Sequence, residues 1–402
     1  MSEWKEIELR EVIETNKSSI NRDYPYAEIL YLDTGSITCN RISGLQSFSL
    51  AEAPSRAKRL VKNLDIIYSS VRPNQLHYGI IRNPENNLVV STGFVVITCK
   101  EEEIAPYFLY HYLSQNTTTE FLHAVAEGST SAYPSLKPSD LEALEILLPP
   151  IEEQRAIASV LSSLDDKIDL LHRQNKTLEQ MAETLFRQWF VVEASEDWEV
   201  KKLGELVTVK RGGSPRPIQK YLSKTGLRWL KISDATKTAS PFIFNIKEHI
   251  KIEGLKKTTL LKKGTLVLSN SATPGIPKIL QVDSCIHDGW LHFPQSYFTK
   301  EFLYLLFKSI RPELLNLGNG SIFTNLKTDI LKQYDIFVPK DENLNTFQNS
   351  VEPLFNKLLA NTTEIRTLEN LRDTLLPKLM SGEVLVTDVE KSFDSITHLQ
   401  EH

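Results

Sequence analysis

The chain has 402 residues, of which 41% are hydrophobic and 24% are charged, and its net charge is −5. This composition indicates a soluble protein with room for two or three domains, and it excludes a membrane-spanning protein because no apolar run approaches the length of a span. Three cysteines, far apart and without metal-type or redox-type spacing, favour a cytoplasmic location, and the acidic start is unlike a signal peptide.

Residues 1–150 are predicted to form a first mixed α/β domain. Runs at 64–68 and 88–97 are rich in Val and Ile and are bounded by Asn, Pro and Gly, which is typical of strands. A helix is predicted at 106–115, with Pro106 in its first turn. Three polar loops, at 34–43, 69–78 and 127–139, are longer than simple connections need. We therefore expect these loops to contribute to function.

Residues 151–194 contain a long helix, predicted at 151–190. Pro149 and Pro150 end the preceding domain, and the helix itself has no Pro or Gly. Its apolar residues recur in alternating steps of four and three, which is the heptad pattern of a coiled coil, and Asn175 interrupts that pattern. The helix would be roughly 60 Å long. A rod of that length needs a partner helix.

The partner lies in the same chain, because the second half of the sequence repeats the first. The residues TLE at 177–179 return at 367–369, and LK at 136–137 returns at 326–327, both shifted by 190 residues. A second domain is predicted at 195–340, a second long helix at 341–384 and a short tail at 385–402. The predicted fold class is α/β (mixed α+β), with two globular domains joined by two long antiparallel helices in a coiled coil with a pseudo-twofold repeat.

The charges are unevenly divided between the two predicted domains. Residues 195–340 hold 23 basic and 13 acidic residues, a net charge of +10, whereas residues 1–150 hold 13 basic and 19 acidic residues, a net charge of −6. A strongly basic domain inside an acidic protein is an electrostatic footprint for a polyanion. The first domain lacks this footprint.

Antiparallel pairing predicts a specific register for the two long helices. Placing Asn175 opposite Asn361 brings the other apolar positions of the two heptad patterns into register. Two buried amides can then satisfy one another, where either alone would cost about 1–3 kcal/mol. A polar pair in an apolar seam is a known means of setting register.

The sequence lacks the motifs that catalysis would need. It has no Gly-rich cofactor loop after a strand, and its only Pro-Pro stands before the first long helix. The glycines at 212–213 lack the Lys and the spacing of a phosphate-binding loop, and the nine histidines show no metal-ligand spacing. Glu199 and Lys201 are only a fragment of the carboxylate cluster that a Mg²⁺-dependent nuclease uses. The sequence therefore predicts no enzyme activity, no cofactor and no metal site.

Three stretches carry a resemblance that covers nearly the whole chain. The first is LLPPIEEQRAIASVLSSLDDKIDLLHRQNKTLEQMAETLFRQWF, the second is TLENLRDTLLPKLMSGEV, and the third is VKRGGSPRPIQKYLSKTGLRWLKISD together with KKGTLVLSN. The chain resembles specificity subunits of type I restriction-modification systems. The first two stretches look like the central and distal helices of that family, and the third is similar to the opening of many of its target-recognition domains. The first domain has no loop similar to RGGSP.

The resemblance implies a non-catalytic targeting subunit. Each globular domain would read one half of a bipartite sequence in double-stranded DNA, and the helices would set the spacer and dock two modification (methyltransferase) subunits. These partners would methylate adenine with S-adenosylmethionine, and restriction subunits would supply ATP-driven, Mg-dependent translocation and cleavage. Two alternatives remain, a stand-alone DNA-binding module and a protein scaffold outside a restriction system, and the basic second domain argues against the scaffold.

DNA reading needs cations for phosphates and paired donors and acceptors for base edges. The candidates are polar residues in and around the loops of each domain. In the first domain they are Arg41, Arg56, Lys58, Arg59, Ser69, Arg72, Asn74, Gln75, His77, Ser129, Thr130, Ser131, Tyr133 and Lys137. In the second they are Lys210, Arg211, Ser214, Arg216, Lys231, Ser233, Asp234, Lys237, Asn270, Ser271, Thr273, Lys278, Asn319, Ser321, Thr324, Asn325 and Lys327.

Overall fold

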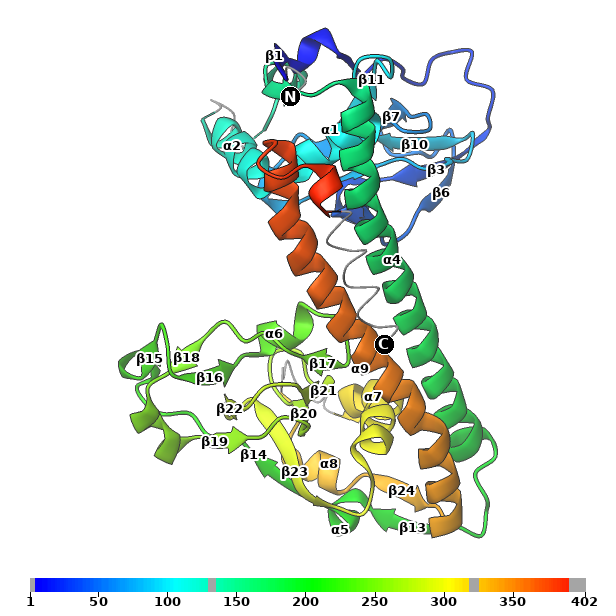
Figure 1. Cartoon of the computed structure of the whole chain (residues 1–402). Helices are drawn as coiled ribbons and strands as arrows, with labels where there is room; N and C mark the ends of the chain where they lie inside the picture. The colour runs from blue at the N-terminus through cyan, green and yellow to red at the C-terminus, as the bar shows by residue number, and fades with distance from the viewer. Residues whose placement is uncertain (1–3, 129–134, 318–324, 390–402) are drawn as a thin grey trace, which may run out of the picture. The chain divides into compact units, whose positions relative to one another are not determined.

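The structure is a computed structural model that describes residues 4–128, 135–317 and 325–389 (Figure 1). These residues divide into two compact units. Unit 1 runs to Asp169 and resumes at Thr367, and unit 2 is Leu170–Arg366. Both divisions fall inside a long helix, α4 (Ile151–Arg187) or α9 (Asp341–Met380). Each unit therefore contains one segment of each long helix.

Unit 1 is built on two four-stranded sheets. Its strands are β1 (Lys5–Glu8), β2 (Ile13–Thr15), β3 (Glu28–Leu32), β4 (Ile37–Thr38), β5 (Arg41–Ile42), β6 (Gln46–Ser49), β7 (Ala57–Leu60), β8 (Ile66–Ser69), β9 (Tyr78–Ile80), β10 (Leu88–Ser91), β11 (Phe94–Cys99) and β12 (Glu145–Leu148). One sheet has the order β2-β11-β8-β9, and the other has the order β6-β3-β10-β7 with β3 and β10 parallel. The pairs β1-β12 and β4-β5 form two small antiparallel ladders.

The helices of unit 1 pack on one face of the β2-β11-β8-β9 sheet. They are α1 (Pro106–Ser114), α2 (Asn116–Glu127), α3 (Pro138–Glu142), the segments of α4 and α9, and the short 3-10 helix Leu9–Glu11. Two further 3-10 helices of unit 1 are Thr34–Ser36 and Pro73–Gln75. In β8, Ile66 and Tyr68 join the helix-side core, whereas Ile67 packs toward the other sheet. The strand is buried on both faces, which is why its sequence is a continuous apolar run without polar alternation.

Unit 2 repeats this architecture. Its strands are β13 (Glu199–Lys202), β14 (Val207–Arg211), β15 (Leu222–Ser223), β16 (Leu227–Leu230), β17 (Phe242–Ile243), β18 (His249–Ile250), β19 (Thr259–Leu261), β20 (Leu266–Ser269), β21 (Pro277–Leu280), β22 (Ser284–Ile286), β23 (Trp290–Ser296) and β24 (Asp335–Val338). They form sheets of order β14-β23-β20-β21-β17 and β15-β18-β16-β22-β19, with the small pair β13-β24. Its shorter helices are α5 (Leu203–Leu206), α6 (Ile232–Thr236), α7 (Lys300–Leu317), α8 (Thr328–Lys332) and the 3-10 helices Ile218–Lys220 and Ile252–Lys257.

Several elements of the two units correspond. The parallel pair β3-β10 of unit 1 corresponds to the parallel pair β16-β22 of unit 2, and β1-β12 corresponds to β13-β24. Helices α3 and α8 begin at Pro138 and Thr328, and strands β12 and β24 begin at Glu145 and Asp335, so both shifts are 190 residues. The repeat found in the sequence is thus also a repeat of structure.

Two predicted elements differ from those observed. The run at 88–97 forms two strands, β10 and β11, because Gly93 turns the chain and its N–H donates to Ser91 Oγ (3.1 Å). Helix α4 ends at Arg187, earlier than predicted, and a π-helical turn, Gln188–Val192, follows it. That turn allows the Phe190 ring to pack on Phe347 of α9, with ring centroids 4.7 Å apart.

The two long helices pack antiparallel in the part of the seam that lies in unit 2. Phe186, near the end of α4, meets Phe347 near the start of α9. Farther along the seam, Asn175 Nδ2 donates to Thr362 Oγ1 (3.3 Å), and Asn361 Nδ2 donates to Gln174 Oε1 (3.2 Å). Each asparagine therefore bonds to the neighbour of the other, and both Oδ1 atoms are buried without a partner among the described residues. The two amides do not bond to each other as expected. In the predicted register Gln174 lies opposite Thr362, and the two observed bonds run diagonally between that pair and the pair of asparagines.

Candidate nucleic-acid interface

The same backbone arrangement follows an inner strand of a sheet in both units, β8 in unit 1 and β20 in unit 2. In unit 1, Ser70 N–H donates to the carbonyl of Gly93 (2.8 Å), and the Ser70 carbonyl accepts from Leu136 N–H (2.7 Å). In unit 2, Asn270 N–H donates to Gly289 (2.9 Å), and the Asn270 carbonyl accepts from Leu326 N–H (2.7 Å). Isolated bridges join Val71 to Ser135 and Ser271 to Asn325.

We call this arrangement the loop clamp, defined by Ser70, Gly93 and Leu136 in unit 1 and by Asn270, Gly289 and Leu326 in unit 2. The clamp joins three segments. They are the loop after β8 or β20, the turn between β10 and β11 or between β22 and β23, and the segment before the short helix α3 or α8. Two of the three polar loops predicted in each half are therefore brought together by main-chain hydrogen bonds. Because the bonds use only backbone groups, the side chains around them can differ between the units.

In unit 2 a third segment reaches the clamp, which we call the Gly-Gly loop (residues 211–216). A Cβ on Gly212 would lie 2.3 Å from the His287 carbonyl oxygen, and a Cβ on Gly213 would lie 2.8 Å from the Lys257 carbonyl oxygen. Only glycine allows so close an approach. The side chains of Arg211 and Arg216, which flank the two glycines, are exposed.

Several predicted cations of unit 2 are accessible. Lys210, Arg211, Arg216, Lys237 and Lys327 are exposed, and Asn325 is exposed at the edge of the clamp. Lys231 is half-buried and pairs with Glu248 (3.2 Å). Ser233 is exposed on α6, whereas Asp234 accepts from Lys231 N–H (3.0 Å) and so caps the start of that helix. Ser271 and Thr273 are half-buried in the loop after β20.

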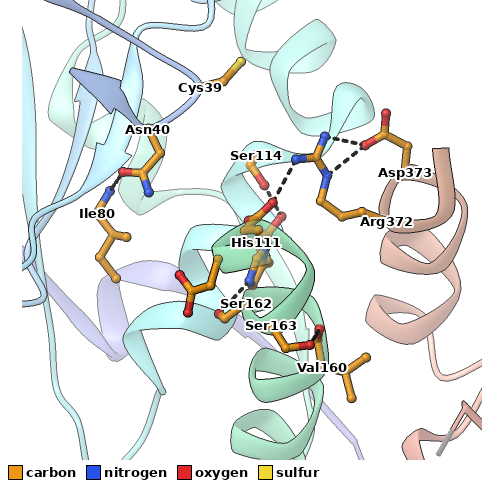
Figure 2. Close-up of polar contacts among 12 residues, drawn as sticks. Cys39, Asn40, Ile80, His111, Ser114, Val160, Ser162, Ser163, Arg372 and Asp373 are labelled. Atoms are coloured by element: carbon orange, nitrogen blue, oxygen red, sulfur yellow. Dashed lines mark hydrogen bonds and ion pairs between the residues drawn. The ribbon is translucent and has the colours of Figure 1, made fainter. Parts of the chain in front are cut away.

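In unit 1 the loop after β8 is tied to the β4-β5 hairpin. His77 Nδ1 donates to the carbonyl of Ile37 (2.6 Å), and Ile80 N–H donates to Asn40 Oδ1 (2.9 Å), as Figure 2 shows for the second contact. These bonds bring the predicted loops at 34–43 and 69–78 together. Arg72, Asn74 and Gln75 are exposed at their junction.

The remaining cations of unit 1 lie on three elements. Arg41 of the hairpin pairs with Glu369 of α9 (3.4 Å). The Arg56 carbonyl accepts from Thr92 N–H (2.8 Å), which places Arg56 beside the turn of the clamp. Lys58 is exposed on β7, Arg59 donates to Ser19 Oγ (3.4 Å), and Lys137 is exposed at the start of α3.

For two residues the prediction of DNA contact is wrong, because their side chains are buried. Lys278 is 4% exposed, and its Nζ donates to the carbonyls of Thr238 (2.8 Å) and Ser240 (2.5 Å). Burial lowers the pKa of Lys278 to about 8. Ser69 is 1% exposed, and its hydroxyl donates to the Val71 carbonyl (2.9 Å). Both side chains stabilise loops from inside, and neither is available to DNA.

Two more candidates have restricted side chains. Asn270 is 2% exposed, and its Oδ1 has no partner in the described chain. Ser214 is half-buried, and its hydroxyl donates to Asp288 Oδ1 (2.7 Å). Predicted residues that lie outside the described residues are Ser129, Thr130, Ser131, Tyr133, Asn319, Ser321 and Thr324.

The sequence reasoning missed the turn His287-Asp288-Gly289 between β22 and β23. This turn accepts hydrogen bonds from the Gly-Gly loop and supplies the glycine of the loop clamp. The dipeptide Asp-Gly is a strong turn signal between strands, and it was the one available clue.

A half-buried charged cluster joins α1 to the long helices within unit 1. Arg372 of α9 donates to Asp165 of α4 (2.8 Å) and to Asp373, as Figure 2 shows for Asp373. His111 is 1% exposed and lies beside Ser162. Burial lowers the pKa of His111 to about 3 and raises the pKa of Asp165. His111 is therefore neutral at physiological pH, and the cluster stabilises the attachment of the domain to its helices.

Within residues 4–128, 135–317 and 325–389, no group of three or more His, Cys, Asp and Glu side chains is placed to hold a metal ion. The helices of the described chain include none that is both long and apolar enough to cross a bilayer.

Comparisons with known proteins give matches over most of the chain. A family described as type I restriction modification DNA specificity domain matches residues 1–180 and again 195–370. The chain is 26% identical, over 472 residues, to the type I restriction enzyme HindI specificity subunit of Haemophilus influenzae, covering 96% of this chain and 100% of the relative. It is 29% identical, over 336 residues, to the MjaIX specificity subunit of Methanocaldococcus jannaschii, covering 77% and 76%.

Among solved structures, the chain is similar to the S subunit of a type I restriction-modification system from M. genitalium. The TM-score is 0.59 at 16% identity, and the match covers 94% of this chain and 96% of that chain. This similarity concerns the fold.

Proposed function

The chain belongs to the family of type I restriction modification DNA specificity domains, of which it contains two, and from this premise we propose that its units read the two halves of a bipartite DNA target. The chain is then the specificity subunit of a type I restriction-modification enzyme. It selects the sequence, and other polypeptides carry out the reaction.

One observation supports this proposal above all, namely that the loop clamp is the same in both units while the side chains around it differ. Unit 1 presents Arg72, Asn74 and Gln75, whereas unit 2 presents Arg211 and Arg216. Side chains with paired donors and acceptors read base edges, and cations contact phosphates. A shared frame with different side chains is what two readers of different sequences require.

The charges of the two units suggest unequal contributions to affinity. The segment 195–340 has a net charge of +10 and segment 1–150 a net charge of −6, so phosphate attraction by unit 1 alone is weak. We propose that a bound modification subunit supplies the positive surface beside unit 1. DNA affinity should then rise strongly when the modification subunits are added to the full chain. Tight, salt-sensitive binding by the chain alone, with no gain on adding them, would contradict this.

The proposal assigns the chemistry to partners. Two modification subunits would dock on α4 and α9 and methylate adenine with S-adenosylmethionine, and restriction subunits would use ATP and Mg²⁺. The long helices would set the spacer between the half-sites. The free thiols of Cys39, Cys99 and Cys285 fit a cytoplasmic location.

The test is an exchange of residues 195–340 for the corresponding segment of another family member, followed by reconstitution with the modification subunits. Sequencing of methylated adenines should show new letters in one half of the target and the original letters in the other. The unexchanged chain, reconstituted in parallel, provides the control. A target that changes in both halves, or methylation without sequence preference, would refute the two-reader proposal.

A further inference from the structure

We propose that Asp288 is a positioning residue for DNA reading, and that it holds the Gly-Gly loop so that Arg211 and Arg216 face the duplex. The inference rests on the proposed function and adds a specificity-determining residue to unit 2.

Three side chains of the Gly-Gly loop donate hydrogen bonds to Asp288. Its carboxylate accepts from Ser214 Oγ (2.7 Å) through Oδ1 and from Arg216 Nη2 (3.2 Å) through Oδ2. Its main-chain carbonyl accepts from Arg211 Nε (3.2 Å) and Nη2 (2.8 Å). The direction of both guanidinium groups is therefore set by one turn.

The turn that carries Asp288 is itself held firmly. Gly289 N–H donates to His287 Nδ1 (2.8 Å), and Gly212 N–H donates to the Trp290 carbonyl (2.9 Å). A Cβ on Gly289 would lie 2.3 Å from Ser271 Oγ, so the turn also contacts the loop after β20. Trp290 is fully buried. Because the turn is anchored in the core by Trp290, it can hold the Gly-Gly loop in a fixed position.

The charges at this point favour an orienting role over a stabilising one. The hydrogen bond from the Ser214 hydroxyl is the main reason that the pKa of Asp288 lies below its ordinary value, so the carboxylate is ionised at neutral pH. The side chains of Arg216 and Asp288 are 78% and 46% exposed. An ion pair this exposed to solvent contributes little to stability. Most of the Arg216 side chain faces solvent, where a phosphate or a guanine edge can be reached.

The described part of unit 1 has no equivalent of the Asp288 contacts. Its corresponding turn has Thr92 before Gly93, so no carboxylate stands at that position. Gly93 approaches the 3-10 helix at Thr34 instead, where a Cβ would lie 2.9 Å from Thr34 Cγ2. The effect of Asp288 should consequently be confined to the half-site that unit 2 reads, which the exchange of residues 195–340 identifies.

The experiment compares Asp288→Ala and Asp288→Asn in the full chain with its modification subunits. The matched control is Asp283→Ala, because Asp283 is also a half-exposed carboxylate of unit 2 (43%) that binds a cation, Lys262 (2.8 Å). The readout is methylation of DNA duplexes that carry single base changes in one half-site or the other.

Asp288→Ala should lower discrimination about tenfold in the half-site of unit 2 and leave the other half unchanged. Asp288→Asn, which keeps an acceptor for Ser214, should recover about half of that loss on a logarithmic scale. Asp283→Ala should match the unaltered chain.

Equal losses in both halves, or the same loss in Asp283→Ala, would show a merely structural role and overturn the inference. Unchanged discrimination by Asp288→Ala, beside an unaltered chain that discriminates in both halves, would overturn the inference alone. An unaltered chain that discriminates in neither half would overturn the proposed function and this inference with it.

Discussion

Replacing Lys278 by Met should make the stability of unit 2 less dependent on pH without changing how the chain responds to salt when it binds DNA. Lys278 lies on β21 with its ammonium bonded to two carbonyls, and burial lowers its pKa from the ordinary 10.5 to about 8. Between these two values the unfolded chain binds more protons than the folded chain. The free energy of unfolding therefore rises with pH across this window.

The size of the effect follows from the difference between the two pKa values of Lys278. A tenfold change in proton affinity corresponds to about 1.36 kcal/mol, so the Lys278 contribution should increase by about 2–3 kcal/mol from about pH 7 to about pH 10. Lys278→Met lacks this contribution. The variant also leaves two carbonyls without a donor, but that cost does not vary with pH. The difference between the two proteins should therefore change with pH by this amount.

The assay is urea unfolding followed by tryptophan fluorescence, because Trp229 and Trp290 are buried in unit 2. DNA affinity at several salt concentrations is measured on the same proteins. Arg216→Met is the matched control, since loss of an exposed phosphate contact should lower the salt slope by about 1. Parallel pH profiles for Lys278→Met and the unaltered chain, or a lower salt slope for Lys278→Met, would refute the reasoning.

Three further predictions concern the long helices. Asn175→Leu removes a 3.3 Å bond to Thr362 and also one unsatisfied buried oxygen. Hydrogen exchange of α4 should therefore show stability that is unchanged or up to about 1 kcal/mol higher, and a loss above about 2 kcal/mol would contradict this. Arg372→Ala leaves Asp165, whose side chain is 19% exposed, without its cation, and should destabilise unit 1 by about 2–4 kcal/mol in urea unfolding at neutral pH. Because burial raises the pKa of Asp165, the loss of stability caused by Arg372→Ala should decrease as this carboxyl becomes protonated at acid pH. A loss that stays the same from neutral to acid pH would contradict this explanation. Removing one heptad from both long helices should shorten the unread spacer of the target by about three base pairs and leave its letters unchanged, as mapping of methylated adenines would show.

The site shows where reasoning from sequence reached its limit. The three polar loops were recognised by composition, and two of them meet at the loop clamp in each unit. Ser69 and Lys278 were polar residues in the right segments, yet both are buried. Composition cannot separate a side chain that bonds inward from one that faces solvent, because both occur beside strands and glycines. That distinction depends on partners such as the Thr238 carbonyl, 40 residues away.

The sequence by itself determined the repeat, the long helices and the unequal charges of the two halves. Those properties are carried by spacing and residue type along the chain, and a heptad pattern or a shift of 190 residues is visible without any fold. Only the tertiary structure decided that Asp288 meets the Gly-Gly loop 72–77 residues away and that Asn175 faces Thr362. Contacts between distant segments depend on how strands pair and helices pack, and heptad spacing alone does not decide which of two adjacent side chains an amide bonds to.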